Sequence, residues 1–137
     1  MENSFKRDIK SLDGVFDFLD RCITLHHLSE SLAFTIKFAT EEIFTNMAKY
    51  NPQSPNDISI SLNVGADHVV VKFVDFEAVP FDPTRVKDVN LNLPINERKP
   101  GGLGIHLVKK MMDKVEYEYR DGRNHIRLTK RIASPTP

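Results

Sequence analysis

The chain has 137 residues and a mass of 15.7 kDa, with 40% hydrophobic and 28% charged residues. This composition excludes a disordered chain, a collagen-like fibre and a disulfide scaffold, and it predicts one globular domain over residues 1–133 with a frayed tail at 134–137. No apolar run approaches the roughly 20 residues that cross a bilayer, and the N-terminus lacks an apolar signal core. The single cysteine, Cys22, cannot form an internal disulfide. We therefore expect a cytoplasmic protein without a membrane segment.

The charge is balanced overall but unevenly distributed. There are 19 basic and 19 acidic residues, yet residues 98–137 carry ten Lys/Arg against four Asp/Glu. This basic third can attract an anion, such as a nucleotide phosphate, an acidic protein or nucleic acid, or it can be a solvated face. Overall neutrality disfavours a dedicated DNA-binding protein, so we expect no direct nucleic-acid partner.

The N-terminal half is predicted to hold two helices. Apolar spacing indicates a first helix after Ser11, whose side chain can cap it, with Cys22 on its apolar stripe as a core residue. A polar turn at residues 26–29 separates it from a longer second helix that ends near Tyr50. Prolines shortly beyond that position end the second helix.

The C-terminal half is predicted to hold strands and one further helix. Alternating residues indicate strands over 58–64 and 69–74, and the next 25 residues, 76–100, contain four prolines and little periodicity. A loop of this length inside a compact domain is usually functional or disordered. A third helix then follows Gly101-Gly102.

Two last strands complete the pattern, over 114–119 and 125–131, on either side of a hairpin turn at Asp121-Gly122. Strands joined by hairpins, with alternating faces, favour antiparallel pairing. The predicted fold class is therefore α/β (α+β): a two-layer sandwich of a mixed, mostly antiparallel sheet with helices on one face.

A carboxylate and a carboxamide lie one turn apart on the second helix, in the segment Glu41-Glu42-Ile43-Phe44-Thr45-Asn46. Glu42 and Asn46 are four residues apart, so they share a helix face beside the apolar stripe. Glu42 is suited to accept a proton from an attacking hydroxyl, and the side-chain carbonyl of Asn46 is a hard ligand suited to Mg²⁺. Taken alone, such a pair is more typical of a solvent-facing helix surface.

Two further motifs favour a nucleotide. Asp75 ends an apolar strand, where it can accept a hydrogen bond from an exocyclic amine such as that of adenine, or simply start a turn. The run Gly101-Gly102-Leu103-Gly104 opens a helix whose free N–H groups and positive dipole end favour phosphate, and Arg98 and Lys99 add positive charge just before it. Glycines also serve plain turns, so each motif by itself is weak.

Together and in this order, the three motifs resemble the N, G1 and G2 boxes of the GHKL ATPase superfamily, over roughly residues 5–131. The segments EEIFTN, PFDP and GGLGIHLVKKMMDKVEY are most similar to the anti-sigma factor serine kinases of bacterial partner-switching systems. The resemblance implies the Bergerat fold of the histidine-kinase-type ATPases, with ATP and Mg²⁺ as cofactors.

The resemblance also implies a role for each matching residue. Glu42 would be the catalytic glutamate, Asn46 the Mg²⁺ ligand and Asp75 the reader of the adenine amino group. Residues 76–100 would form the ATP lid. The phosphate-binding positions would be those of the glycine run and the two cations before it, namely Arg98, Lys99, Gly101, Gly102, Leu103 and Gly104.

The implied activity is that of a protein serine/threonine kinase that phosphorylates a small STAS-type anti-sigma antagonist and also sequesters a sigma factor; homodimerisation is a further expectation of the family. One departure matters, because Glu77 occupies the third position of the D-x-G motif, where the family has glycine. The alternative is therefore a non-catalytic regulatory module of the same fold, with weakened or lost nucleotide binding. A free-standing histidine-kinase catalytic domain and a nucleic-acid module are less favoured.

Overall fold

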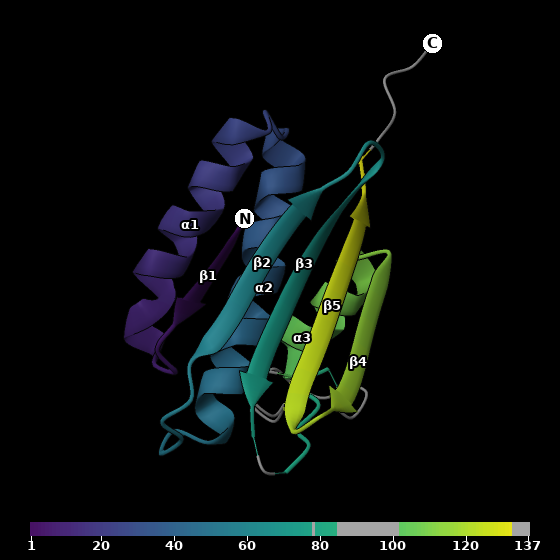
Figure 1. Ribbon diagram of the computed structural model, residues 1–137. Helices are drawn as coiled ribbons and strands as arrows, with labels where there is room; N and C mark the ends of the chain where they lie inside the picture. The colour runs from purple at the N-terminus through teal and green to yellow at the C-terminus, as the bar shows by residue number, and fades with distance from the viewer. Residues whose placement is uncertain (78, 85–101, 133–137) are drawn as a thin grey trace.

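The computed structural model describes residues 1–77, 79–84 and 102–132, and Figure 1 shows one sheet with its helices gathered on one face. The elements in chain order are β1 (Glu2–Phe5), a 3₁₀ turn η1 (Ile9–Ser11), α1 (Leu12–Leu25), α2 (Glu30–Tyr50), β2 (Ile58–Val64), β3 (His68–Phe76), α3 (Gly102–Met111), β4 (Lys114–Arg120) and β5 (Arg123–Arg131). The predicted two-layer α+β sandwich with a mostly antiparallel sheet is confirmed, and all four strand pairings, in the order β1-β2-β3-β5-β4, are antiparallel. The described strands include no parallel pair of the predicted mixed sheet, because hairpins join β2 to β3 and β4 to β5, and β1 pairs antiparallel at the edge.

Strand alternation decides which side chains face the helices. On β3, every second residue is buried, from Val69 through Val71 and Phe73 to Asp75, and the register continues to Glu77 just beyond the strand. The period of two therefore turns two carboxylates toward the helix-covered face, where the preceding positions hold the core. This face is the one on which a site between sheet and helices can form.

The two long helices supply the other half of the core. The predicted stripe of α2 is confirmed, with Ile36, Ala39, Ile43 and Met47 at most 1% exposed. Ser29 caps this helix by accepting a hydrogen bond from the backbone N–H of Leu32, 3.2 Å away. In Figure 1, the C-terminal end of α2, the end of β3 and the start of α3 all lie at the same lower end of the sandwich.

The start of α1 agrees with the prediction, but the proposed cap is wrong. Ser11 has helical backbone angles and makes no capping bond; its hydroxyl donates instead to the carbonyl of Lys6, 2.8 Å away. The reason is the preceding η1 turn, which Asp8 caps by accepting from the N–H of Lys10. Cys22 is fully buried in the core, as expected, and burial raises the pKa of its thiol.

Strand β1 was missed by sequence reasoning. Three of its four residues are exposed, so its pattern carries almost no hydrophobic signal, and it forms only by pairing with the edge of β2. Its last residue, Phe5, packs edge-on against Phe18 and Phe44 of the helices. The strand therefore places Arg7, two residues further along the chain, on the helix-covered face of the sheet.

The predicted hairpin between the last two strands is confirmed. Asp121 and Gly122 both have positive φ angles, 55° and 72°, as a two-residue turn with the twist of a β-hairpin requires. The tail at 134–137 lies outside the described residues. Within the described ranges, no helix is long and apolar enough to span a membrane.

Candidate active site

Glu42 and Asn46 occupy the border between the core and the surface of α2. Both are half-buried, while Ile43 and Met47 beside them are fully buried. Burial is the main cause that raises the pKa of Glu42, the charge of Glu41 adds to it, and Lys49 opposes both. A carboxylate with a raised pKa beside a helix interface is a stronger base than an ordinary glutamate and is suited to accept a proton.

The glycine run meets Glu42 through Gly104, the third residue of α3. A Cβ built on Gly104 would lie 2.0 Å from Oε2 of Glu42 and 2.4 Å from its Cδ, closer than any side chain tolerates. Because glycine has no Cβ, the first turn of α3 can rest directly against the carboxylate. The structure thus brings together the first and third motifs, which are about sixty residues apart in the sequence.

Other members of the predicted phosphate site are placed only in part. Gly102 and Leu103 are the first two residues of α3, whose free N–H groups form the positive end of the helix. Arg98, Lys99 and Gly101 lie outside the described residues, as do residues 78 and 85–100 of the predicted lid at 76–100.

Asp75 is buried at the end of β3, with 3% of its side chain exposed. Its Oδ2 accepts a hydrogen bond from Nη2 of Arg7 at 2.6 Å. Its Oδ1 is also buried, and among the described residues it has no hydrogen-bond partner. Because buried acceptors are nearly always paired in folded proteins, Oδ1 fits a donor that the described residues do not supply, such as an exocyclic amine.

Arg7 is a buried residue of the candidate site that the sequence did not reveal. Its side chain is 2% exposed, and it binds Asp75 together with Glu77, whose Oε1 lies 2.8 Å from Nη2. Nη1 donates to the carbonyl of Met47 at 2.7 Å, and Nε donates to the carbonyl of Asn56 at 3.3 Å. No motif marks this arginine, since its partners come from α2, the loop after it and the end of β3.

These contacts also connect Asp75 to the first motif. The carbonyl that Nη1 binds belongs to Met47, the residue after Asn46 on α2. One guanidinium therefore links Asp75 to the helix that carries Glu42 and Asn46. All three predicted motifs converge on the C-terminal half of α2.

Glu77, the departure from the family motif, is bound by the loop that follows α2. Its Oε1 accepts from the hydroxyl of Ser54 at 2.7 Å, and its Oε2 accepts from the side-chain amide of Asn51 at 3.3 Å. With Arg7, its carboxylate has three separate donors, so its charge is satisfied inside the protein.

Phe81, in the described segment after Glu77, contacts both the sheet and α2. Phe81 stacks on Tyr50 with ring centres 3.7 Å apart, and its N–H donates to Oδ1 of Asn124 at 3.0 Å. The same oxygen accepts from the hydroxyl of Tyr117 at 2.6 Å, and the hydroxyl of Tyr119 donates to the carbonyl of Glu77 at 2.7 Å. This PFDP segment is thus anchored beside the end of α2.

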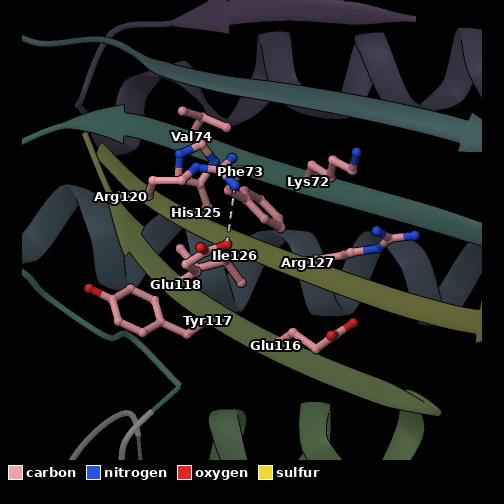
Figure 2. Close-up of a pocket in the computed structure, with 10 residues that line it drawn as sticks. All are labelled: Lys72, Phe73, Val74, Glu116, Tyr117, Glu118, Arg120, His125, Ile126 and Arg127. Atoms are coloured by element: carbon pink, nitrogen blue, oxygen red, sulfur yellow. Dashed lines mark ion pairs between the residues drawn. The ribbon is translucent and has the colours of Figure 1, made fainter. Parts of the chain in front are cut away.

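A hollow lies on the sheet face that none of the described helices covers. Figure 2 shows its lining, and the space measures about 470 Å³. Its side chains form cross-strand ladders of mixed charge, in which Lys72 and Arg127 lie beside Glu116, and Arg120 pairs with Glu118 at 3.6 Å. None of the predicted site residues that the structure describes lines this hollow, so we place the candidate site on the helix-covered side.

Comparison with known proteins gives the family. Residues 5–130 match the family described as the histidine kinase-like ATPase domain. The chain is also 30% identical over 107 residues to the serine/threonine-protein kinase BtrW of Bordetella bronchiseptica, a match that covers 77% of this chain and 75% of that protein. The resemblance stated from the sequence is confirmed, and a domain of this type implies ATP binding. The chain therefore belongs to the histidine kinase-like ATPase domain family.

Proposed function

We propose that this protein is an ATP-dependent protein serine/threonine kinase of a partner-switching system, acting in the cytoplasm. It would phosphorylate a STAS-type anti-sigma antagonist and sequester a sigma factor when free of it, working as a homodimer. The observation that carries the proposal is the contact between the Glu42 carboxylate and the Gly104 backbone, which joins a base to a helix N-terminus. The family and the similarity to BtrW support it.

In this proposal, each residue has a defined task. The purine amino group would bind Asp75, and the phosphates would lie at the glycine-rich start of α3, assisted by Arg98 and Lys99. Asn46 would hold Mg²⁺, which offsets charge on the phosphates. The oxygen of a substrate serine forms the new bond to the γ-phosphorus, its proton goes to Glu42, and the bond to the β-phosphate oxygen breaks to release ADP.

Phosphorylation explains how the partner would be switched. The added phosphate places about two negative charges on the antagonist. This charge would break the complex between antagonist and kinase, and the kinase surface would then be free to bind the sigma factor.

A second candidate is a non-catalytic regulatory module of the same fold. The contact that favours it is the ion pair between Arg7 and Asp75, since it occupies one oxygen of the carboxylate proposed to read the base. A module of this kind would keep the protein interface and bind ATP weakly or not at all.

The test is calorimetric titration with ATP, with and without Mg²⁺, followed by phosphoryl transfer from radiolabelled ATP to a purified STAS-type protein. We expect saturable binding that requires Mg²⁺ and is lost in Asn46→Ala. Transfer should be lost in Glu42→Ala and retained in Glu30→Ala, a matched change of an exposed glutamate at the far end of the same helix. Absence of binding at millimolar ATP would favour the non-catalytic module, and transfer by Glu42→Ala would refute the role of Glu42.

A further inference from the structure

We propose that Arg7 is a positioning residue of the nucleotide site, and that Glu77 keeps it in the orientation the site requires. One nitrogen of the Arg7 guanidinium binds both Asp75 and Glu77. Oδ1 of Asp75 is thereby left to accept a hydrogen bond from the amino group of the purine base. The inference rests on the proposed binding of ATP. It assigns a function to the residue that departs from the family motif.

The geometry of Arg7 limits how it can bind Asp75. Nη2 carries two N–H groups, and its two acceptors are Oδ2 of Asp75 at 2.6 Å and Oε1 of Glu77 at 2.8 Å. Nε and Nη1 each donate to a backbone carbonyl, those of Asn56 and Met47. A guanidinium that is held on all sides in this way cannot form the two parallel bonds with which arginine usually binds a carboxylate.

The consequence is an unequal supply of donors to the two carboxylates. Glu77 accepts from Arg7, Ser54 and Asn51, whereas Asp75 accepts from Arg7 alone among the described residues. The unmet acceptor is Oδ1 of Asp75, which is buried from solvent. An N–H donor fits this position, because a buried carboxylate oxygen without a hydrogen bond is costly.

Removal of the Glu77 charge should therefore harm base recognition. In Glu77→Gln, the second N–H of Nη2 loses its charged acceptor, and the nearest remaining carboxylate oxygen is Oδ1 of Asp75. Arg7 would turn toward that oxygen and compete with the purine amino group. This predicted loss of ATP affinity is opposite to the effect expected if Glu77 simply obstructed the pocket. In that case, its removal would improve ATP binding.

The experiment compares two nucleotides that differ at the purine 6-position. ATP carries an amino group there and an unprotonated N1, whereas ITP carries an oxygen and an N1–H, so the ratio of their affinities reports how the site recognises this edge of the base. We expect the wild-type protein to prefer ATP in calorimetric titration. Glu77→Gln should lower ATP affinity about tenfold, as loss of one hydrogen bond to a charged group does, while ITP affinity changes little. A purely structural role of Glu77 would lower both affinities equally.

Two further variants make the result interpretable. Glu118→Gln is the matched control, because Glu118 is an exposed glutamate that pairs with Arg120 outside the site, and its affinity ratio should equal that of the wild type. Arg7→Lys keeps the positive charge but not the planar guanidinium, so it should reduce the preference for ATP over ITP. If a thermal melt shows that Glu77→Gln does not fold, Arg7→Lys alone tests the positioning role of Arg7.

The possible failures are distinguishable. If ATP binds with a clear preference over ITP, and Arg7→Lys and a folded Glu77→Gln keep that preference, the role of Arg7 and Glu77 is refuted while the proposed function stands. If the wild-type protein binds neither nucleotide, the proposed function fails and the inference fails with it.

Discussion

Gly104→Ala is the substitution that probes the candidate site most directly. The new Cβ would lie 2.0 Å from Oε2 of Glu42, and ordinary contact needs about 3.4 Å, so the carboxylate must retreat by roughly 1.4 Å. The retreat itself is cheap, because this carboxylate is the end of a flexible side chain. Misplacing a catalytic group by about 1 Å can reduce a rate about a hundredfold. We expect a loss of that order in ATP turnover.

The fold should not suffer from the same substitution. Alanine is about 1 kcal/mol more favourable than glycine within a helix, so the free energy of unfolding should stay the same or rise. Gly14→Ala is a matched control, since Gly14 is likewise the third residue of its helix, α1, and its Cβ would make only ordinary contact with Phe5 at 3.7 Å. It should gain stability in the same way without loss of turnover.

The assay is single-turnover conversion of ATP to ADP, with urea unfolding of both variants and calorimetric ATP affinity measured in parallel. Turnover of Gly104→Ala at the wild-type rate would refute the placement of Glu42 as a base held against α3. A large drop in stability would instead mean that the first turn of α3 had moved, and that the Glu42 side chain cannot retreat at low cost.

Three further predictions concern protonation, the turn and a buried amide. Burial and the charge of Glu41 raise the pKa of Glu42. In a pH–rate profile, turnover should therefore rise with pH, and its midpoint should lie above that of an ordinary glutamate. Glu41→Gln should lower this midpoint. A carboxyl whose pKa is raised in the folded state stabilises the fold at low pH and loses that contribution as pH rises through this pKa. Glu42→Gln should therefore melt no lower than the wild type at pH 7. A clearly lower melting temperature would contradict the raised pKa. Gly122→Ala places a side chain at φ 72° and should lower the free energy of unfolding in urea by about 1 kcal/mol. Gly65→Ala is the control, because its Cβ makes only ordinary contacts. Equal stability of the two variants would refute strain at the turn. Asn124→Ala removes the oxygen that binds Tyr117 and Phe81, and should cost about 2 kcal/mol in the same assay, with no change meaning that water replaces it.

Local patterns were sufficient for much of the fold. The helices, four of the five strands and the Asp121-Gly122 hairpin follow from apolar spacing and turn residues, whose effects act over a few neighbours. Strand β1 could not be predicted, because its exposed residues gain their pairing only from β2, more than fifty residues away. The capping role of Ser11 failed for a similar reason, since the η1 turn satisfies the backbone first.

For the candidate site, the sequence alone indicated which residues to propose: Glu42 and Asn46 one helical turn apart, Asp75 at a strand end, and Gly104 at a helix start. Each of these assignments depends on spacing along one element, which the chain encodes locally. Only the tertiary structure decided how they meet, through the contact of Gly104 with Glu42 and the ion pairs of Arg7. Those contacts join segments forty to seventy residues apart, and no local periodicity encodes them, because they arise when sheet and helices pack around a shared core.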